Sequence, residues 1–241
     1  MKLVEFDVLD EDIIPDDVDV SSLIPQKELN PEIWEGLELR EDVKEIATKI
    51  YNNYTDAIFN NLKNSKIIDI QFTGSLANYN WSSYSDFDIH IVIDYSKISN
   101  NLDLVSEYFR NKTTIYNLTH SYSIKGFEVE LNTNNIEPIK KDVGIYSLLH
   151  NKWIQIPNKD NIVIDYNSVR HKTAQLMNAI DNAECDLKDL KKIKKKIRKM
   201  RQTAIDSKGE FATENLAFKI LRRLGYIKKL KDQIAELEAK I

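Results

Sequence analysis

The chain has 241 residues, of which 42% are hydrophobic, and a formal net charge of −4, which suits one globular domain with an appendage or two small domains sharing a core. Its single cysteine, Cys185, excludes disulfide frameworks and cysteine-based zinc sites and favours a reducing, cytoplasmic location. Because the start lacks the apolar segment of a secretory signal and no apolar run approaches the roughly 18 residues of a transmembrane helix, we expect no membrane partner.

Residues 1–38 are expected to form an irregular N-terminal arm. Pro15, Pro25 and Pro31 interrupt any long element there, because proline removes a backbone donor and disfavours a helical residue before it. Apolar side chains are spaced along the arm so that it would lie against a globular body. The arm is also strongly acidic.

Residues 39–160 are expected to fold around a β-sheet. The sequence from Asp86 to Tyr95 alternates between apolar and polar side chains, which is typical of a strand with one buried face. An apolar stripe at helical spacing predicts a helix over about 40–63. The other elements expected here are a strand over 66–72, a helix over about 101–119, a strand over 127–131, and a hairpin of 145–149 with 153–156.

Residues 161–241 are expected to form a helical domain. Two stretches, over about 187–204 and 216–241, place apolar residues at steps of three and four. They lie on either side of Gly209, which predicts an antiparallel helical hairpin or small bundle. Thr213 is positioned to cap the second helix.

The first of these helices is unusually basic. Residues 188–201 hold nine basic side chains against one acidic side chain. This charge favours RNA binding, but a solvated outer face would explain it as well, and the segment lacks the aromatic side chains of a single-strand binding platform. The basic helix and the acidic arm would face either each other or separate partners.

A motif that carries chemistry follows the strand expected at 66–72. Gly74 and Ser75 are followed by a spacer of ten residues and then by Asp86 and Asp88. Two residues apart in a strand, the two carboxylates point to one face, where they repel each other unless a cation lies between them. Mg²⁺ takes oxygen ligands and shares them with substrate phosphates. Two such ions about 4 Å apart activate an attacking oxygen and neutralise a leaving pyrophosphate.

A third carboxylate from a neighbouring strand would complete such a site. Glu128 and Glu130 lie on one face of the strand expected at 127–131, and alternation alone does not choose between them.

Several other residues are candidates to hold an NTP. Gly74 has no Cβ, so its backbone can approach a phosphate closely. Ser75 would begin a short helix whose amides favour anions and would add a hydroxyl donor. Asn78 and Ser85, in the spacer, are candidates to orient the nucleotide, and Lys219 in the last helix is the best candidate there to reach a triphosphate.

These residues resemble the active-site signature of the DNA polymerase β-like nucleotidyltransferase superfamily. The segment that carries the resemblance is FTGSLANYNWSSYSDFDIHIVID, followed by VEL at 129–131. The second match ranks Glu130 above Glu128 as the third carboxylate. More loosely, ELNPEIW, GIYSLLHNKWIQIP and GEFATENLAFKILRR resemble a group of short phage and bacterial predicted nucleotidyltransferases.

The resemblance implies an α+β nucleotidyltransferase fold, with a small mixed sheet flanked by helices. It implies Mg²⁺, held by the catalytic residues Asp86, Asp88 and Glu130, and an NTP from which a nucleoside monophosphate is transferred with release of pyrophosphate. The resemblance leaves the acceptor open among RNA, a protein and a small molecule, and it leaves the oligomeric state open as well. Two alternatives remain: a catalytically silent nucleotide-binding or interaction module, and an RNA-binding protein that reuses the fold.

Overall fold

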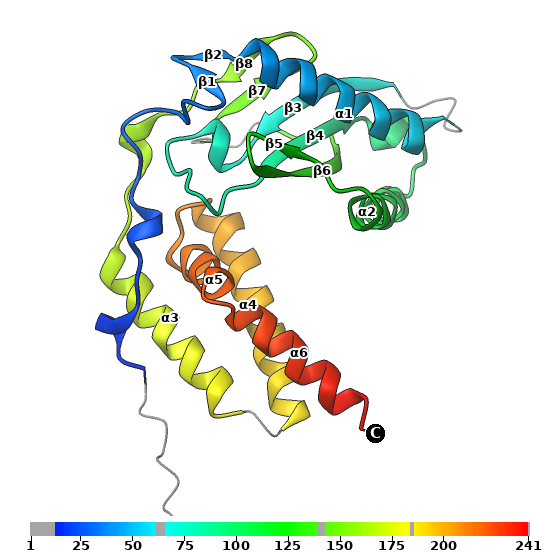
Figure 1. The fold of residues 1–241 in the computed structure, drawn as a ribbon. Coiled ribbons are helices and arrows are strands. Elements are labelled where there is room, and N and C mark those ends of the chain that lie inside the picture. Colours follow the sequence, from blue (N-terminus) through cyan, green and yellow to red (C-terminus); the bar gives the residue numbers. More distant parts are fainter. Residues whose placement is uncertain (1–12, 61–65, 139–142, 184–185, 241) are drawn as a thin grey trace, which may run out of the picture. The chain divides into compact units, whose positions relative to one another are not determined.

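The computed structural model describes residues 13–60, 66–138, 143–183 and 186–240 (Figure 1). The chain divides into two compact units. The first, called the sheet unit below, spans Leu23–Ile162, and the second, the helical unit, combines Val163–Ile241 with Met1–Ser22. The predicted arm is therefore not a unit of its own, because its two halves belong to different units. Cys185 lies outside the described residues.

The sheet unit is built on a mixed six-stranded sheet. In their order across the sheet, the strands are β5 (Ser123–Ile124), β6 (Phe127–Asn135), β4 (Phe87–Ile93), β3 (Ile67–Thr73), β7 (Ile145–Ser147) and β8 (Lys152–Gln155). β4 and β6 are parallel, and the other neighbouring pairs are antiparallel. The expected α+β class with a mixed sheet is confirmed, and β6 continues beyond its predicted end at residue 131.

Two helices, α1 (Glu41–Phe59) and α2 (Leu102–Thr119), pack on one face of this sheet. The hydroxyl oxygen of Tyr54 in α1 lies 2.5 Å from Oγ1 of Thr113 in α2 and 2.7 Å from Oγ1 of Thr133 in β6. All three side chains are buried, so these hydrogen bonds join both helices to the sheet. The predicted apolar face of β4, formed by Phe87, Ile89, Ile91 and Ile93, is fully buried, and Asp88 and His90 lie on the opposite, more polar face.

A stack of aromatic rings joins the described arm residues to the sheet. A two-stranded hairpin, β1 (Trp34–Glu35) and β2 (Glu38–Leu39), holds Trp34 in the core. The Trp34 ring stacks on Phe72 of β3 at 5.5 Å between centroids, and Phe72 stacks on Phe87 of β4 at 3.9 Å. The Trp34 indole Nε1 also donates a 2.8 Å hydrogen bond to the Leu76 carbonyl oxygen.

The described helices of the helical unit are α3 (Tyr166–Asp181), α4 (Leu187–Lys208), α5 (Thr213–Arg223) and α6 (Tyr226–Glu238). The long second helix expected from 216 is in fact two helices. Gly225 adopts a left-handed backbone with φ of 82°, which ends α5 and begins α6. The capping role expected for Thr213 was also wrong, because Thr213 is already the first helical residue and Ala212 precedes it without a side-chain cap.

The described start of the chain is fixed to α3 and α5. The Ile13 amide donates to Oδ1 of Asn178 at 2.9 Å, and Nδ2 of Asn178 donates back to the Ile13 carbonyl oxygen at 3.0 Å. Nη1 of Arg223 in α5 donates to the carbonyl and hydroxyl oxygens of Ser22 at 3.1 Å and 2.6 Å. Of the helices that the structure describes, none combines the length and the apolar character needed to cross a membrane.

Candidate active site

The turn between β3 and β4 brings Gly74 against Asp88. Gly74 directly follows β3 and has φ of 78° and ψ of −161°, a backbone conformation that residues with a side chain rarely adopt. A Cβ built at Gly74 would fall onto Oδ2 of Asp88 and would lie 3.0 Å from its Cγ. The Asp88 carboxylate is therefore placed directly over the backbone of the predicted phosphate-binding glycine.

Strand register places Glu130 beside Asp88. Asp88 is paired with Thr73 of β3 on one side and with Glu130 of β6 on the other. Because directly paired residues point to the same face of a sheet, the Asp88 and Glu130 carboxylates share a face. Glu128 is instead paired with Ser123 of β5, and both glutamates are exposed.

Asp86 lies just before β4 rather than inside it, because the strand begins at Phe87 and not at residue 86 as predicted. The Asp86 side chain is partly buried. The next residue, Phe87, stacks its ring on Phe72. Within the described ranges, no three or more histidine, cysteine, aspartate or glutamate side chains are grouped closely enough to hold a metal ion. The structure thus brings Asp88 together with Gly74 and aligns it with Glu130. Asp86 lies two residues before Asp88, immediately before the start of β4.

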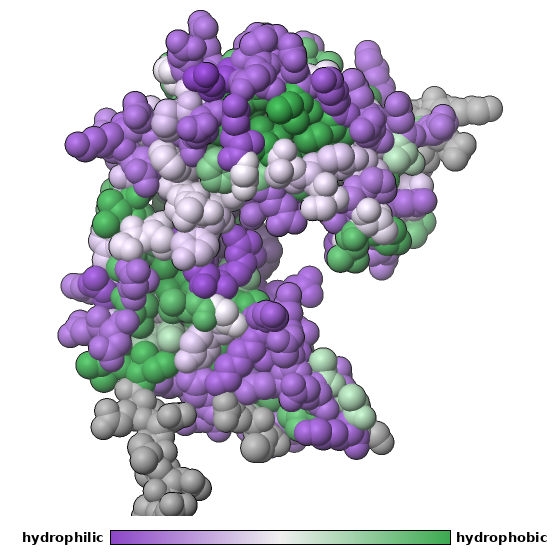
Figure 2. Space-filling model, in the orientation of Figure 1, coloured by the Kyte–Doolittle hydropathy of each residue, from purple (hydrophilic) through white to green (hydrophobic). Residues whose placement is uncertain are grey.

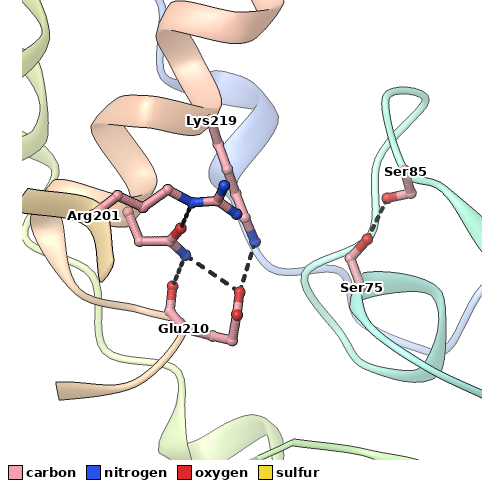
Figure 3. A network of polar contacts seen from close by, with 6 residues as sticks. Ser75, Ser85, Arg201, Glu210 and Lys219 are labelled. Carbon is pink, nitrogen blue, oxygen red and sulfur yellow. Dashed lines mark hydrogen bonds and ion pairs between the residues drawn. The ribbon is translucent and has the colours of Figure 1, made fainter. Parts of the chain in front are cut away.

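Ser75 and Ser85 meet at the two ends of the ten-residue spacer (Figure 3). The Ser75 hydroxyl donates a 2.7 Å hydrogen bond to Oγ of Ser85, which also accepts one from the Ser82 amide at 3.0 Å. Ser75 begins a short 3-10 helix, Ser75–Ala77, labelled η3. Two predicted nucleotide-binding residues are therefore adjacent, and their hydrogen bond closes the spacer into a loop.

Asn78 is buried and holds the same loop together. Its backbone amide donates to the Ser75 carbonyl oxygen at 3.1 Å, and its Oδ1 accepts from the Tyr79 amide at 2.8 Å. These bonds give Asn78 a role in shaping the loop, and its predicted contact with a nucleotide stays a prediction.

His90 lies next along β4 on the face of Asp88. Burial lowers the pKa of the His90 imidazole to about 4, so the ring is neutral at pH 7. Nδ2 of Asn134 donates to Nδ1 of His90 at 3.0 Å, which places the imidazole proton on Nε2. His90 therefore adds a neutral hydrogen-bond donor to this face.

Lys219 belongs to a separate polar cluster in the helical unit (Figure 3). Its Nζ lies 3.1 Å from Oε2 of Glu210, in the loop between α4 and α5. The fully buried Asn215 links this pair to Arg201 of α4, because it donates to Oε2 of Glu210 at 3.2 Å and accepts from Nε of Arg201 at 2.9 Å. The Arg201 guanidinium also lies over the Phe218 ring, 4.3 Å from its centroid.

This cluster determines the ionisation of Glu210. Burial by itself would raise the pKa of the Glu210 carboxyl, but the charge and hydrogen bond of Lys219, the charge of Arg201 and the hydrogen bond from Asn215 outweigh it. The pKa of Glu210 is therefore below its ordinary value, and the carboxylate holds Lys219 as an ion pair.

Sequence patterns alone do not distinguish Thr73, Glu210 or Arg201 as site residues. The Thr73 hydroxyl donates to the Gly144 carbonyl oxygen at 3.0 Å, and only the register shows that it lies beside Asp88. Glu210 and Arg201 are two of many charged residues near the α4–α5 loop, so composition does not distinguish them. The only local signal was Gly209, which marks the loop that carries Glu210.

Comparison with known proteins found no match to this chain among family models, curated proteins or solved structures.

Proposed function

We propose that this protein is a Mg²⁺-dependent nucleotidyltransferase with the polymerase β-like fold and superfamily membership that its sequence motif implies. The observation that carries the proposal is the position of the Asp88 carboxylate directly over Gly74. A glycine with positive φ at the end of one strand allows the carboxylate of an aspartate on the adjacent strand to lie against the turn that would hold the phosphates. The mixed sheet, with helices packed on one face and these groups on the other, supports the same interpretation.

The donor set suits magnesium. Asp86, Asp88 and Glu130 carry the carboxylate oxygens that Mg²⁺ prefers, and Asp88 and Glu130 are aligned on one face of neighbouring strands. The three side chains are not grouped around one point in the described structure, so they would have to converge when the ion binds. When bound, Mg²⁺ would supply positive charge for the triphosphate and for the attacking oxygen. These three side chains would be the ones to hold it.

The other residues position the nucleotide and move a proton. The Gly74 backbone and the Ser75 hydroxyl would hold the β- and γ-phosphates. Because the Ser75 hydroxyl has a single proton, it would turn from Ser85 to donate to a phosphate oxygen. The acceptor hydroxyl oxygen bonds to the α-phosphorus while the bond to pyrophosphate breaks. The exposed Glu130 carboxylate accepts the hydroxyl proton. Asn78 and Lys219 remain predicted contacts of the nucleotide.

Labelled nucleotides test the proposal directly. The protein is incubated with each α-labelled NTP, Mg²⁺ and a cell extract, and the label is traced to RNA, protein or small molecules. The double variant Asp86→Asn/Asp88→Asn should abolish transfer. The matched variant Asp103→Asn/Glu107→Gln, which removes two exposed carboxylates from α2, should keep it. Mg²⁺-dependent nucleotide binding without transfer from any NTP would instead identify a silent nucleotide-binding module.

A further inference from the structure

The outer surface of α4 is covered by exposed basic side chains. Nine of the residues from 188 to 201 are basic. Arg201 packs inside the helical unit on Phe218. The other eight are exposed, and they are Lys188, Lys191, Lys192, Lys194, Lys195, Lys196, Arg198 and Lys199. Figure 2 shows the region of α4 and α6 as mostly hydrophilic.

Among the residues that the structure describes, this charge is poorly compensated. Lys192 pairs with Asp189 at 2.6 Å and Lys191 with Glu238 at 2.7 Å, and both pairs are exposed and therefore weak. Like charges four residues apart, such as Lys191 with Lys195 and Lys195 with Lys199, each destabilise a helix by about 0.2–0.5 kcal/mol. A solvated helix would avoid this repulsion by interspersing acidic residues, so the pattern indicates an anionic partner.

A hollow at the beginning of α4 lies within this basic surface. Its volume is about 630 Å³, and its lining includes Lys188, Lys191, Lys192 and Lys195. The Asp186 carboxylate also lines it, but its Oδ1 accepts hydrogen bonds from the backbone amides of Lys188 and Asp189. The hollow therefore offers several ammonium groups to an anion, with its one carboxylate already engaged.

We propose that the exposed face of α4 binds the phosphodiester backbone of a nucleic acid duplex. A membrane surface fits less well, because α4 exposes no large apolar side chain to insert between lipids. A single strand also fits less well, because residues 188–201 contain no aromatic ring on which bases would stack. The inference that this duplex carries the acceptor hydroxyl rests on the proposed nucleotidyltransferase activity.

The spacing of the charges along α4 sets the expected salt dependence of binding. The outward row from Lys188 to Lys199 extends about 16 Å at 1.5 Å per residue, which spans a few successive phosphates. If about four phosphates are contacted, the logarithm of the binding constant should fall with the logarithm of salt concentration at a slope of about −4. Binding should show little sequence preference, because contacts to phosphates carry no direct sequence information.

The test uses the full-length protein without NTP or Mg²⁺ and measures fluorescence anisotropy of labelled duplexes. The probes are RNA and DNA duplexes of about 20 base pairs, a single-stranded RNA, and vesicles of phosphatidylcholine with phosphatidylserine. The variant Lys195→Glu/Arg198→Glu/Lys199→Glu reverses three exposed charges of α4. The matched variant Lys49→Glu/Lys97→Glu/Lys112→Glu reverses three exposed charges of the sheet unit.

We expect the α4 variant to weaken duplex binding about a hundredfold at low salt and to reduce the salt slope by about 2–3, while the matched variant binds like the wild type. The glutamine version of the α4 variant, with an unchanged melting temperature, should show a smaller loss in the same direction. Comparison of the RNA and DNA duplexes identifies which nucleic acid is the partner. Equal losses in both charge-reversed variants, or binding to vesicles or single strands in preference to duplexes, would overturn the proposal.

The two proposals fail separately. Duplex binding through α4 without nucleotide transfer would leave this inference standing and would contradict the proposed activity. Transfer of label to a protein or small molecule, without duplex binding, would support the proposed activity and contradict the inference about α4. If both hold, the α4 variant should raise the KM for the nucleic acid acceptor and leave kcat nearly unchanged.

Discussion

Both the backbone conformation at position 74 and the close approach of the Asp88 carboxylate require a residue without a Cβ. Gly74→Ala would cost about 1–3 kcal/mol for the positive-φ backbone and would also push the Asp88 carboxylate away, since the new Cβ falls onto its oxygen. We expect loss of transfer activity together with a lower urea midpoint. The control is Gly126→Ala, because Gly126 has a similar φ of 82° but open space around its Cβ position. If both variants lose stability equally and keep activity, the contact between residues 74 and 88 is not functional.

The two exposed glutamates of β6 allow the third carboxylate to be identified. Glu130 is paired with Asp88, whereas Glu128 is paired with Ser123. Glu130→Gln should therefore lower the rate of transfer by about 10²–10⁴-fold, and Glu128→Gln should leave it nearly unchanged. Initial rates at saturating NTP and Mg²⁺ measure both. The opposite ranking would show that Glu128 is the proton acceptor and metal ligand.

The ion pair of Lys219 with Glu210 gives stability a predictable pH dependence. Because the folded-state pKa of Glu210 is below its ordinary value of 4.5, the contribution of the carboxylate is complete above pH 4.5 and is lost as the pH falls through the folded-state value. In Lys219→Met, fewer positive groups oppose the burial that raises the pKa of Glu210. The carboxyl of this variant therefore takes up a proton more readily, and lowering the pH should reduce the stability difference between the variant and the wild type. We expect a deficit of about 1 kcal/mol at pH 7, a modest value because the Glu210 side chain is 39% exposed and screened by solvent.

Chemical unfolding followed by circular dichroism between pH 4 and pH 7 tests this dependence. The deficit of Lys219→Met should shrink as the pH falls. In the background Glu210→Gln the same lysine substitution should cause a deficit that does not vary with pH, since the titrating group is gone. A constant deficit in both backgrounds would mean that Lys219 stabilises the fold through packing.

At this scale the sequence predicted which side chains share a face of one strand and did not predict contacts between separate segments. Alternation in β4 placed Asp88 on the polar face, whereas the contact of Gly74 with Asp88 is known only from the structure. The pairing of Lys219 with Glu210 depends on the path of the α4–α5 loop and on the buried Asn215. No residue spacing in the sequence specifies that path.

Among the elements, the β1–β2 hairpin connects the arm to the candidate site. Its Trp34 donates the indole N–H to the Leu76 carbonyl oxygen within η3, directly after Gly74 and Ser75. Trp34→Phe would leave that buried carbonyl unpaired, at a cost of about 1–3 kcal/mol. The turn should loosen, so the Asn78 amide, which donates to Ser75, should exchange its hydrogen faster.

Hydrogen exchange measured by NMR checks this prediction, with Trp153→Phe as the matched control. The Trp153 indole donates to the Leu37 carbonyl oxygen at 2.7 Å, in the β1–β2 turn and not in η3. Both variants should lose stability, but only Trp34→Phe should accelerate exchange at Asn78. Equal acceleration in the two variants would show that η3 is held by the core as a whole.

Element boundaries followed from the sequence where one physical signal dominated. Alternation located β4 to within two residues at each end, and helical periodicity located α1 and α2. The break at Gly225 was missed because the apolar positions of α5 and α6 continue the same period across it. Since one glycine inside a helix costs only about 1 kcal/mol relative to alanine, its presence in the sequence did not by itself predict a turn.

The whole molecule is organised differently from the predicted succession of arm, sheet domain and helical domain. One boundary falls between Ser22 and Leu23, and the described residues before it, 13–22, belong with the C-terminal helices. This pairing of the two ends of the chain relies on specific hydrogen bonds, such as those between Asn178 and Ile13 and between Arg223 and Ser22. Composition and periodicity carry no signal for contacts between residues so far apart in the sequence.

This division predicts that residues 23–162 fold without the rest of the chain. The segment is continuous, and it contains the complete hydrophobic cluster from Leu29 to Trp153, including the aromatic stack of Trp34 with Phe72. It also contains all three tryptophans of the protein, so tryptophan fluorescence reports on this unit alone. Urea unfolding of the fragment should therefore be cooperative, with a fluorescence midpoint close to that of the full-length protein. A broad transition with strong binding of a hydrophobic dye would show instead that the core of the sheet unit requires the helical unit to become ordered.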